Sequence, residues 1–561
     1  MQRPARQRRA GPLLIATALW VLMAPASLAA TAKRSTTYDT LLTELERILR
    51  DLENFDAIVA TPAAEAGANG SQLRLPAPAP LAIPKGSAPL AVRDRVRLSL
   101  SQALALAVSN SPVVAQSAAD VERERALLRA AWGRYAPTLN LSLGALGAQR
   151  VERSEAVIGN STIYPSSSPF VVESGSWKRG LFNSGAALLN LSEQYVLLDY
   201  SRGPALAKAQ NRLDQTRQTY ADNLRQLQLS ISESYYAIQL SELRKRIRMA
   251  EVFNNDAVRE QASALFRSGL VPRVDVLRAE AALQQSRYQL AQEEANLLSN
   301  QRGLSNLVNV PFDVTLLATD SVQLQPPWPL DLPQTLAAGF SNNPQLQAIE
   351  AARSALLRQA DEQAAALLPS LIVYVSAQLG QNTVADTDRR NTGCCGAAVI
   401  PELSTSTVGW AAGLQVSWKL MDGGVSRGLA DASRAQAAST GERQAQERNA
   451  IRQRLEQAFF QHRASLTQVI AARASLKAAR EAFRDMRARY QLGLSDYTDV
   501  SDAIVSLTQA MEDKAAAITT ANISYARMLR DLLPVPDAPE QPVVLPITLP
   551  QGRDQSPPTP R

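Results

Sequence analysis

The sequence predicts an α+β protein made of two tandem repeats, each with a pair of β-strands and long antiparallel helices. Three observations carry this prediction. A series of landmarks occurs twice in the same order, apolar residues alternate on both sides of a Ser/Gly-rich loop in each copy, and long stretches contain almost no Gly or Pro. Ala, Leu, Gln, Arg and Glu dominate those stretches, which is a composition typical of long helices and coiled coils.

The N-terminus predicts export. Residues 1–30 read as a secretory signal peptide, because four arginines precede a short apolar run and then the small residues of APASLAATA. The apolar run is too short to span a bilayer. Without it the formal net charge of +7 falls to about +3, so the basic balance does not indicate a nucleic-acid partner.

An additional N-terminal segment, 31–97, precedes the repeats. Its part TTYDTLLTELERILRDLENFDAIV has the spacing of a coiled-coil seam and predicts a helix near residues 37–60. The following LPAPAPLAIPKGSAPL is a Pro/Ala-rich linker. The helix is predicted to dock on the outside of the protein or to contact a partner.

The two repeats are predicted at 98–310 and 330–533, joined by a linker at 311–329. Each begins with a helix pattern that breaks at SNSP or SNNP, where Pro fits the first turn of a new helix. The landmarks that correspond between the repeats are Pro112 and Pro344, Pro137 and Pro369, Asp199 and Asp422, Gly269 and Gly493, and Asp275 and Asp499.

Strands follow the break in each repeat. Period-two alternation places apolar residues on one face and small or polar ones on the other, as expected of a wall between lipid and water. The apolar positions are Leu139, Leu141 and Leu143 in the first copy, Leu371, Val373 and Val375 in the second, and Trp410, Ala412, Leu414, Val416, Trp418 and Leu420 in the return strand.

A very long helix is predicted next in each copy, over 205–268 and 429–492, at about 100 Å each. The chain then turns at Gly269 or Gly493 and returns as a second helix, to Gly303 in the first copy and Leu533 in the second. No compact domain buries such lengths, so these helices must pack on other long helices. The Pro-rich tail, 534–561, reads as disordered.

Catalytic chemistry has no basis in the sequence. No nucleophile motif, phosphate-binding loop or metal-spaced cluster occurs, so we expect no enzyme, cofactor or metal. The adjacent Cys394 and Cys395 are the only cysteines, and we interpret them as part of a surface loop. The single His462 lies mid-helix and reads as a packed or solvated residue rather than a ligand.

The stretch YQLGLSDYTDVSDA carries three acids on one helical stripe, Asp496, Asp499 and Asp502. Acids are common at helix starts because they favour the positive end of the helix dipole. Asp496 is a candidate cap on this ground. For Asp499 and Asp502 a helix-start role and a role in an assembly both remain open.

This order of features resembles the TolC-like outer-membrane channel family, over residues 98 to 533. The landmarks that carry the resemblance are the Asn-Pro helix break, the Pro-x-Leu before the first strand, LMDGG after the last strand and the Gly-to-Asp-Val helix turn. The resemblance implies a homotrimer whose chains pool four strands each into one β-barrel and their helices into a coiled-coil tunnel. Strand counting alone permits a dimer or a trimer.

The resemblance also implies a site at the helix turn. Asp499 and Asp502, in D-V-S-D, correspond to aspartate rings that narrow the pore. Tyr490 and Asp275 correspond to a hydrogen-bonded latch between the inner and outer helix pairs. Where the latch often includes an Arg, this chain has Ser495, and Arg273 on the opposing turn is a candidate substitute.

The implied function is a passive duct in the outer membrane that extends into the periplasm and belongs to a tripartite efflux or type I secretion system. A periplasmic adaptor would dock at the turns around Gly269 and Gly493, an inner-membrane transporter would supply energy, and outer-membrane lipid would surround the strands. The alternative is a structural coiled-coil envelope protein without a pore.

Overall fold

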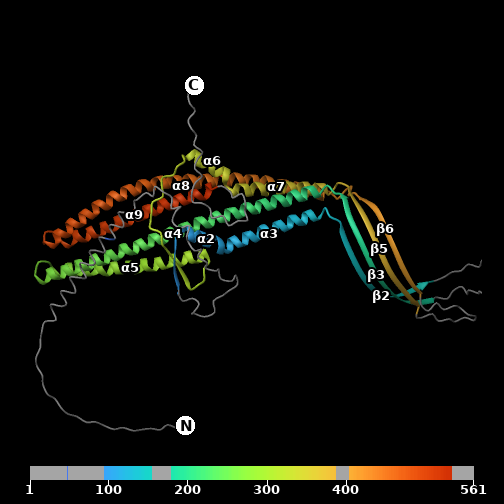
Figure 1. Ribbon diagram of the computed structural model, residues 1–561, viewed down its shortest axis with the longest axis horizontal. Coiled ribbons are helices and arrows are strands. Elements are labelled where there is room, and N and C mark those ends of the chain that lie inside the picture. Colours follow the sequence, from blue (N-terminus) through green and yellow to red (C-terminus); the bar gives the residue numbers. More distant parts are fainter. Residues whose placement is uncertain (1–46, 48–91, 93, 155–177, 387–402, 534–561) are drawn as a thin grey trace, which may run out of the picture.

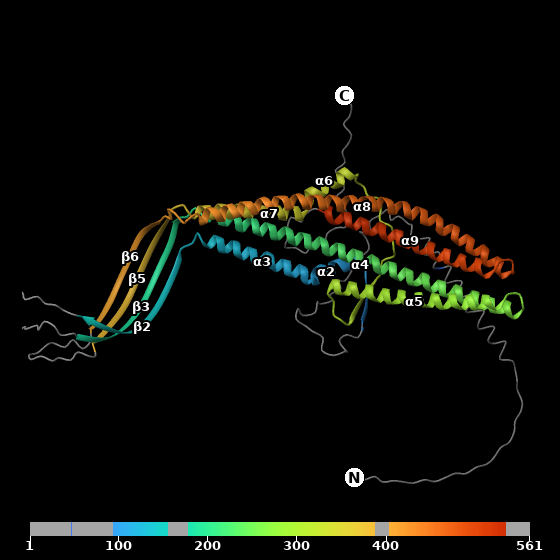
Figure 2. The same ribbon diagram turned by 180° about the vertical axis from the view of Figure 1, so that it is seen from behind.

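The computed structural model describes residues 47, 92, 94–154, 178–386 and 403–533 of the 561-residue chain. The predicted signal peptide, the C-terminal tail, Cys394 and Cys395, and nearly all of the predicted N-terminal helix lie outside the described residues. The described part is elongated, with the strands at one end and two helical turns at the other (Figures 1 and 2).

One four-stranded antiparallel sheet holds both repeats together. Its strands are β2 (Thr138–Ser154), β3 (Lys178–Leu198), β5 (Ser370–Asp386) and β6 (Leu403–Ser417), in the order β2-β3-β5-β6. The β3–β5 ladder therefore joins the first repeat to the second. Trp418 and Leu420, which the alternation assigned to the return strand, lie beyond its end.

The register confirms the predicted two-faced pattern. Leu141 pairs with Leu191, Leu191 with Ala377, and Ala377 with Trp410, so these residues share one face. We call this the apolar face. Its most exposed residues include Leu139, Leu141, Leu143, Val375, Leu379, Val408, Trp410, Leu414 and Val416, and the opposite face carries Asn140, Ser142, Gln194, Gln378 and Gln415.

Short helices form around each Asn/Ser-Pro break, as predicted. In the first repeat α2 (Leu100–Asn110) is followed by α3 (Pro112–Gly133), and the Ser111 hydroxyl accepts from the backbone of Val114. In the second repeat α6 (Leu332–Asn342) is followed by α7 (Pro344–Ala365), and the Asn343 side chain accepts from Gln345 N, at 2.9 Å. Each cap satisfies amides that a new helix leaves free.

Two helices run the whole length of the helical region. They are α4 (Arg202–Arg267) and α8 (Val425–Gln491), of 66 and 67 residues, or about 100 Å each. Asp422 explains the LMDGG landmark at the start of α8, because its carboxylate accepts from the backbone of Gly424 and Ser426. The Ser426 hydroxyl also donates to this carboxylate, and its hydrogen bond, followed by that of the Ser426 backbone, lowers the pKa of Asp422.

The returning helices are α5 (Arg273–Val308) and α9 (Tyr497–Leu532). Next to the strands the helices contact in the order α3-α4-α7-α8, and towards the tips in the order α5-α4-α9-α8. α7 and α9 thus occupy the same layer in succession between the two continuous helices α4 and α8 (Figure 1). Ala279, Phe483, Val500, Ile504 and Met511 belong to the buried cluster of the tip half.

A buried arginine sits where α9 ends and α7 begins. Arg225 of α4 is only 2% exposed and donates to the carbonyl oxygens of Asn342, Arg530 and Leu533. The last carbonyls of a helix have no partner within it, so one guanidinium here satisfies the ends of both α6 and α9.

A two-stranded parallel sheet was not predicted. β1 (Asp94–Leu98) pairs with β4 (Val314–Ala318), which lies in the segment expected to be a plain linker, 311–329. Leu98 and Leu316 from these strands are buried with Ile231 and Tyr235 of α4. The two five-residue strands thus join the start of the first repeat to the segment that precedes the second repeat.

Candidate functional site

The two helical turns at the far end of the molecule have the same geometry in both repeats. Gly269 and Gly493 have φ of 76° and 72°, a left-handed conformation that favours glycine. Past each glycine the chain bonds back to the helix, from Leu270 N to Leu265 O and from Leu494 N to Arg489 O, both at 2.9 Å. These bonds close the helix ends and make both turns tight.

The three acids of the predicted helical stripe, Asp496, Asp499 and Asp502, have different surroundings. Asp496 is the N-cap of α9, since its side chain accepts from the backbone N of Asp499 at 3.0 Å, which confirms its predicted capping role. Asp499 and Asp502 are exposed on the face of α9 away from the buried Val500 and Ile504. They therefore face solvent in one protomer, and their assignment to a ring stays a prediction.

Tyr490 and Asp275 lie near one another without the predicted hydrogen bond. Tyr490 is 1% exposed, and within the described residues its hydroxyl has no hydrogen-bond partner. Burial, and after it the charge of Asp275, raise the pKa of Tyr490 to about 12, so the hydroxyl stays a proton donor at neutral pH. The latch between these two residues stays a prediction.

The cation beside this pair is Arg278. Its Nη1 lies 3.7 Å from the Asp275 carboxylate, whereas Arg273 is exposed and takes no part in the ion pairs of the described tip. Burial raises the pKa of Tyr497 on α9, and Arg278 opposes this rise after the hydrogen bond with Ser501. The i,i+3 spacing from Asp275 was the sequence signal for Arg278.

A second contact between the helix pairs lies further from the tip and was not predicted from the sequence. Arg248 of α4 reaches Glu512 of α9 at 2.7 Å, Glu251 at 2.7 Å and Gln289 of α5 at 2.9 Å. Burial raises the pKa of Glu512, and Arg248 is the main group that opposes this rise. No spacing rule pairs residues that lie so far apart in sequence.

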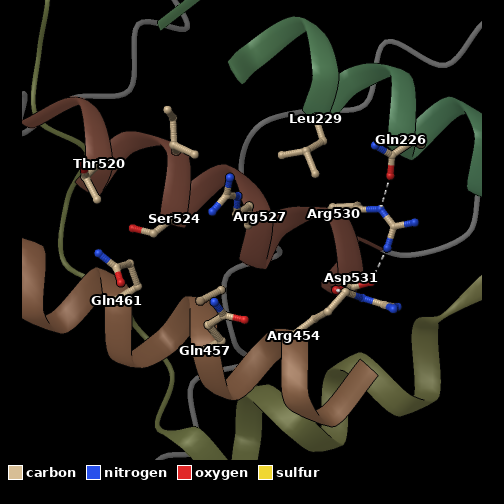
Figure 3. A pocket seen from close by; sticks show the side chains of 12 residues that line it. Gln226, Leu229, Arg454, Gln457, Gln461, Thr520, Ser524, Arg527, Arg530 and Asp531 are labelled. Carbon is tan, nitrogen blue, oxygen red and sulfur yellow. Dashed lines mark hydrogen bonds and ion pairs between the residues drawn. The ribbon is translucent and has the colours of Figure 1, made fainter. Parts of the chain in front are cut away.

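A pocket of about 590 Å³ lies between α4, α8 and α9 near the junction with α7 (Figure 3). Its basic side chains are already engaged. Arg530 contacts Gln226, Asp222 and Asp531, Arg527 pairs with Glu233 at 2.8 Å, and Arg454 pairs with Glu447 at 3.2 Å. With every guanidinium held by an acid, this arrangement joins helices and offers no free anion site.

His462 is packed between α8 and α9. It is 2% exposed, and Nδ1 lies 3.1 Å from Ala521 O, so this nitrogen carries the proton and donates. Burial lowers the pKa of His462, which leaves the ring neutral at pH 7. Of the two interpretations that the sequence left open, a packed or a solvated residue, the structure shows the packed one.

Among the described side chains, no three His, Cys, Asp or Glu residues gather as a metal site. Within the same residues, no helix has the length and apolar character needed to cross a lipid bilayer.

Known proteins resemble this chain over most of its described part. The family described as outer membrane efflux protein matches residues 103–310 and 337–532. Protein CyaE of Bordetella pertussis (strain Tohama I) is 26% identical over 269 residues, which cover 47% of this chain and 51% of that protein. The matched region thus spans about half the length of this relative.

Two solved outer-membrane proteins share the fold. VceC of Vibrio cholerae aligns with a TM-score of 0.59 and 17% identity, over 77% of this chain and 95% of that one. The CmeC outer membrane channel of Campylobacter jejuni aligns with a TM-score of 0.58 and 14% identity, over 82% and 94%. The family match covers more than half of the sequence, so the chain belongs to the outer membrane efflux protein family, with the fold of a TolC-like efflux or secretion channel that sits in the outer membrane and extends into the periplasm.

Proposed function

We propose that three copies of this chain form the outer-membrane channel of a tripartite efflux or type I secretion system. The observation that carries this proposal is the four-stranded sheet, whose outer strands β2 and β6 have no further partner in the described chain. Open strand edges are not tolerated in lipid, and four strands are too few to close a barrel. Pairing of β6 with β2 of the next copy closes the wall.

In this trimer the tips of α8 and α9 form the periplasmic entrance. Asp499 and Asp502 of three chains place six carboxylates around one opening. Exposed acids of one sign make a field that concentrates cations and repels anions. The mutual repulsion is tolerated because both side chains are solvated in the protomer.

The same end of the molecule offers a surface for a periplasmic adaptor. Leu270, Leu492 and Leu494 beside the two glycine turns are each more than 70% exposed. Apolar residues at this density on a helical tip suit a helical hairpin from a partner. Energy for transport then comes from the inner-membrane transporter that the adaptor joins.

The test is planar-bilayer recording of the wild type and of a variant with both Asp499→Ala and Asp502→Ala, in asymmetric salt. Ala keeps the helix intact, so we expect a trimer of normal yield that has lost cation selectivity and block by divalent cations from the periplasmic side. The matched control, Asp120→Ala with Asp361→Ala, removes two exposed acids from the strand-proximal helices and should keep the wild-type selectivity.

Unchanged selectivity in the Asp499/Asp502 variant would refute the ring. A wild-type protein recovered as a monomer from the soluble periplasmic fraction would refute the channel and favour the pore-free coiled-coil protein.

A further inference from the structure

A single acid interrupts the apolar face of the sheet. Glu193 on β3 pairs in register with Leu139 on one side and Val375 on the other, so its side chain lies on the same face as theirs. Leu139 is 67% exposed and Val375 is 43% exposed. Within the described part of the chain, no hydrogen bond or ion pair engages the Glu193 carboxylate. An unpaired charge on such a face needs an explanation.

A hollow surrounds this carboxylate. It has a volume of about 400 Å³ and is lined by Tyr135, Pro137, Glu193, Tyr195, Val373 and Val375. Glu193 is the only charged residue of this lining. Of the other lining residues, two are tyrosines and the rest are apolar. The buried Arg202 lies over the Tyr135 ring, at 5.3 Å from the ring centre.

The hollow lies at the end of the strands that is nearest the helices. Leu139, opposite Glu193, is the second residue of β2, and Tyr135 belongs to the segment that leads from α3 into that strand. Trp132 packs against Tyr135 in a tilted arrangement, with ring centres 5.8 Å apart. Aromatic residues gather where a membrane protein meets lipid headgroups, so Glu193 lies at headgroup depth and not in the hydrocarbon centre.

We propose that this hollow binds the headgroup of a phospholipid with a primary ammonium group, from the leaflet that faces the periplasmic helices. The proposal rests on the proposed channel, in which the apolar face meets lipid. The ammonium donates to the Glu193 carboxylate and lies against the tyrosine rings, whose faces attract cations. The acyl chains of the lipid then follow the apolar face beyond Val373 and Val375.

A hard metal cation fits this hollow poorly. Ca²⁺ and Mg²⁺ are bound by about six or more oxygen ligands, and here one carboxylate stands among carbon-rich walls. An anionic headgroup is repelled by the same carboxylate. Charge complementarity and the aromatic walls therefore favour an organic ammonium group.

The experiment is native mass spectrometry of the purified full-length trimer from mixed vesicles of ethanolamine, choline and glycerol phospholipids with identical acyl chains. We expect the wild type to retain the ethanolamine lipid, up to one molecule per chain. Glu193→Gln keeps the shape and removes the charge, and its preference for the ethanolamine over the glycerol lipid should fall about tenfold. Asp214→Asn, an equal loss of charge on the exposed part of α4, should retain the lipid as the wild type does.

Equal retention by wild type and Glu193→Gln would overturn the site, and equal retention of the choline lipid would overturn the assignment to a primary ammonium. Bilayer conductance of the same samples separates this proposal from the channel itself. A conducting Glu193→Gln trimer without bound lipid supports the site, whereas a wild type that neither inserts nor conducts would refute the channel on which the proposal rests.

Discussion

At the residue scale, the Tyr490 hydroxyl is one of two buried side-chain groups of the described tip without a hydrogen-bond partner, and Ser495 Oγ is the other. The Tyr490 hydroxyl is buried beside Asp275 and has no hydrogen-bond partner among the described residues. Leaving a buried donor unpaired costs about 1–3 kcal/mol. The described conformation therefore carries a cost that a closed latch would remove, and the latch would favour a different placement of α8 against α5.

Tyr490→Phe tests the latch directly. Phe lacks the hydroxyl that is unpaired in the described conformation, so the variant stabilises that conformation. It also removes about 1 kcal/mol of stabilisation from a conformation in which the latch hydrogen bond has formed. We expect a larger open fraction in single-channel recordings. Tyr288→Phe, at an exposed position of α5, is the control and should leave the open fraction unchanged. Identical gating of Tyr490→Phe and wild type would show that Tyr490 only fills space.

His462 predicts a dependence of stability on pH. Burial holds its pKa in the folded state below the ordinary value of 6.5, so the unfolded state binds the proton more readily. Stability is therefore lost as the pH falls through 6.5 and below, and is retained above that window. We expect the unfolding temperature to drop less between pH 7.5 and 5.5 in His462→Gln than in the wild type. If the unfolding temperatures of His462→Gln and the wild type fell equally with pH, the conclusion that His462 is buried and neutral would be contradicted.

At the element scale, the repeats differ where a helix comes unusually close to another. Gly339 of α6 occupies the position that Ala107 occupies in the first repeat. A Cβ built on Gly339 would lie 2.4 Å from Cδ1 of Leu455 on α8, which is itself fully buried. Glycine at this position is therefore a packing requirement of the second repeat, and the backbone there needs no special conformation.

Gly339→Ala should cost stability for this reason, by about 1–3 kcal/mol, the usual penalty for overpacking. Gly303→Ala makes the same change within α5, where nothing lies within 4 Å of the added carbon, and should gain about 0.5–1 kcal/mol. Chemical denaturation of the two variants provides the comparison. A change of the same sign in the free energy of unfolding of both variants would refute the close approach of α6 and α8.

The contact of Arg248 with Glu512 predicts a measurable coupling between α4 and α9. Their side chains are 18% and 14% exposed, so solvent screens them little, and a double-mutant cycle should give about 0.5–3 kcal/mol. The pair Arg434 with Asp431, at 53% and 72% exposed, is the matched control and should give at most about 0.5 kcal/mol. Equal coupling in both cycles would mean that the Arg248 contact does not hold the helix pairs together.

At the scale of the whole molecule, much of the fold was predictable because it follows from the periodicity of apolar residues and from the positions of Gly and Pro. The alternation around Leu139 and Leu371 gave the strands, and the scarcity of Gly and Pro gave α4 and α8. The β1–β4 pair was missed because it joins two short segments more than 200 residues apart, and pairing over that distance leaves no local pattern. The Arg248 contact and the Glu193 hollow were missed for the same reason, since both depend on register or packing between distant segments.

The two-faced sheet gives a prediction for assembly. Leu414→Asp places a charge on the apolar face of β6 and should lower the yield of membrane-inserted trimer, at a cost below the roughly 2–4 kcal/mol known for basic residues at the bilayer midplane. Gln415→Asp, the next residue on the opposite face, should insert normally. Heat-modifiable migration of extracted outer membranes measures the trimer, and equal yields would reverse the assignment of the faces.

The succession of α7 and α9 has a mechanical consequence. α4 and α8 pass the level of Arg225 as unbroken rods, whereas the layer between them changes there from one helix to another. In the proposed trimer, the tunnel wall would therefore be stiff along the two continuous helices of each chain and compliant along the layer between them, at the level of Arg225. We expect a torque applied at the tips to be absorbed at that height, so that the aperture changes its diameter while the strands in the membrane keep their register.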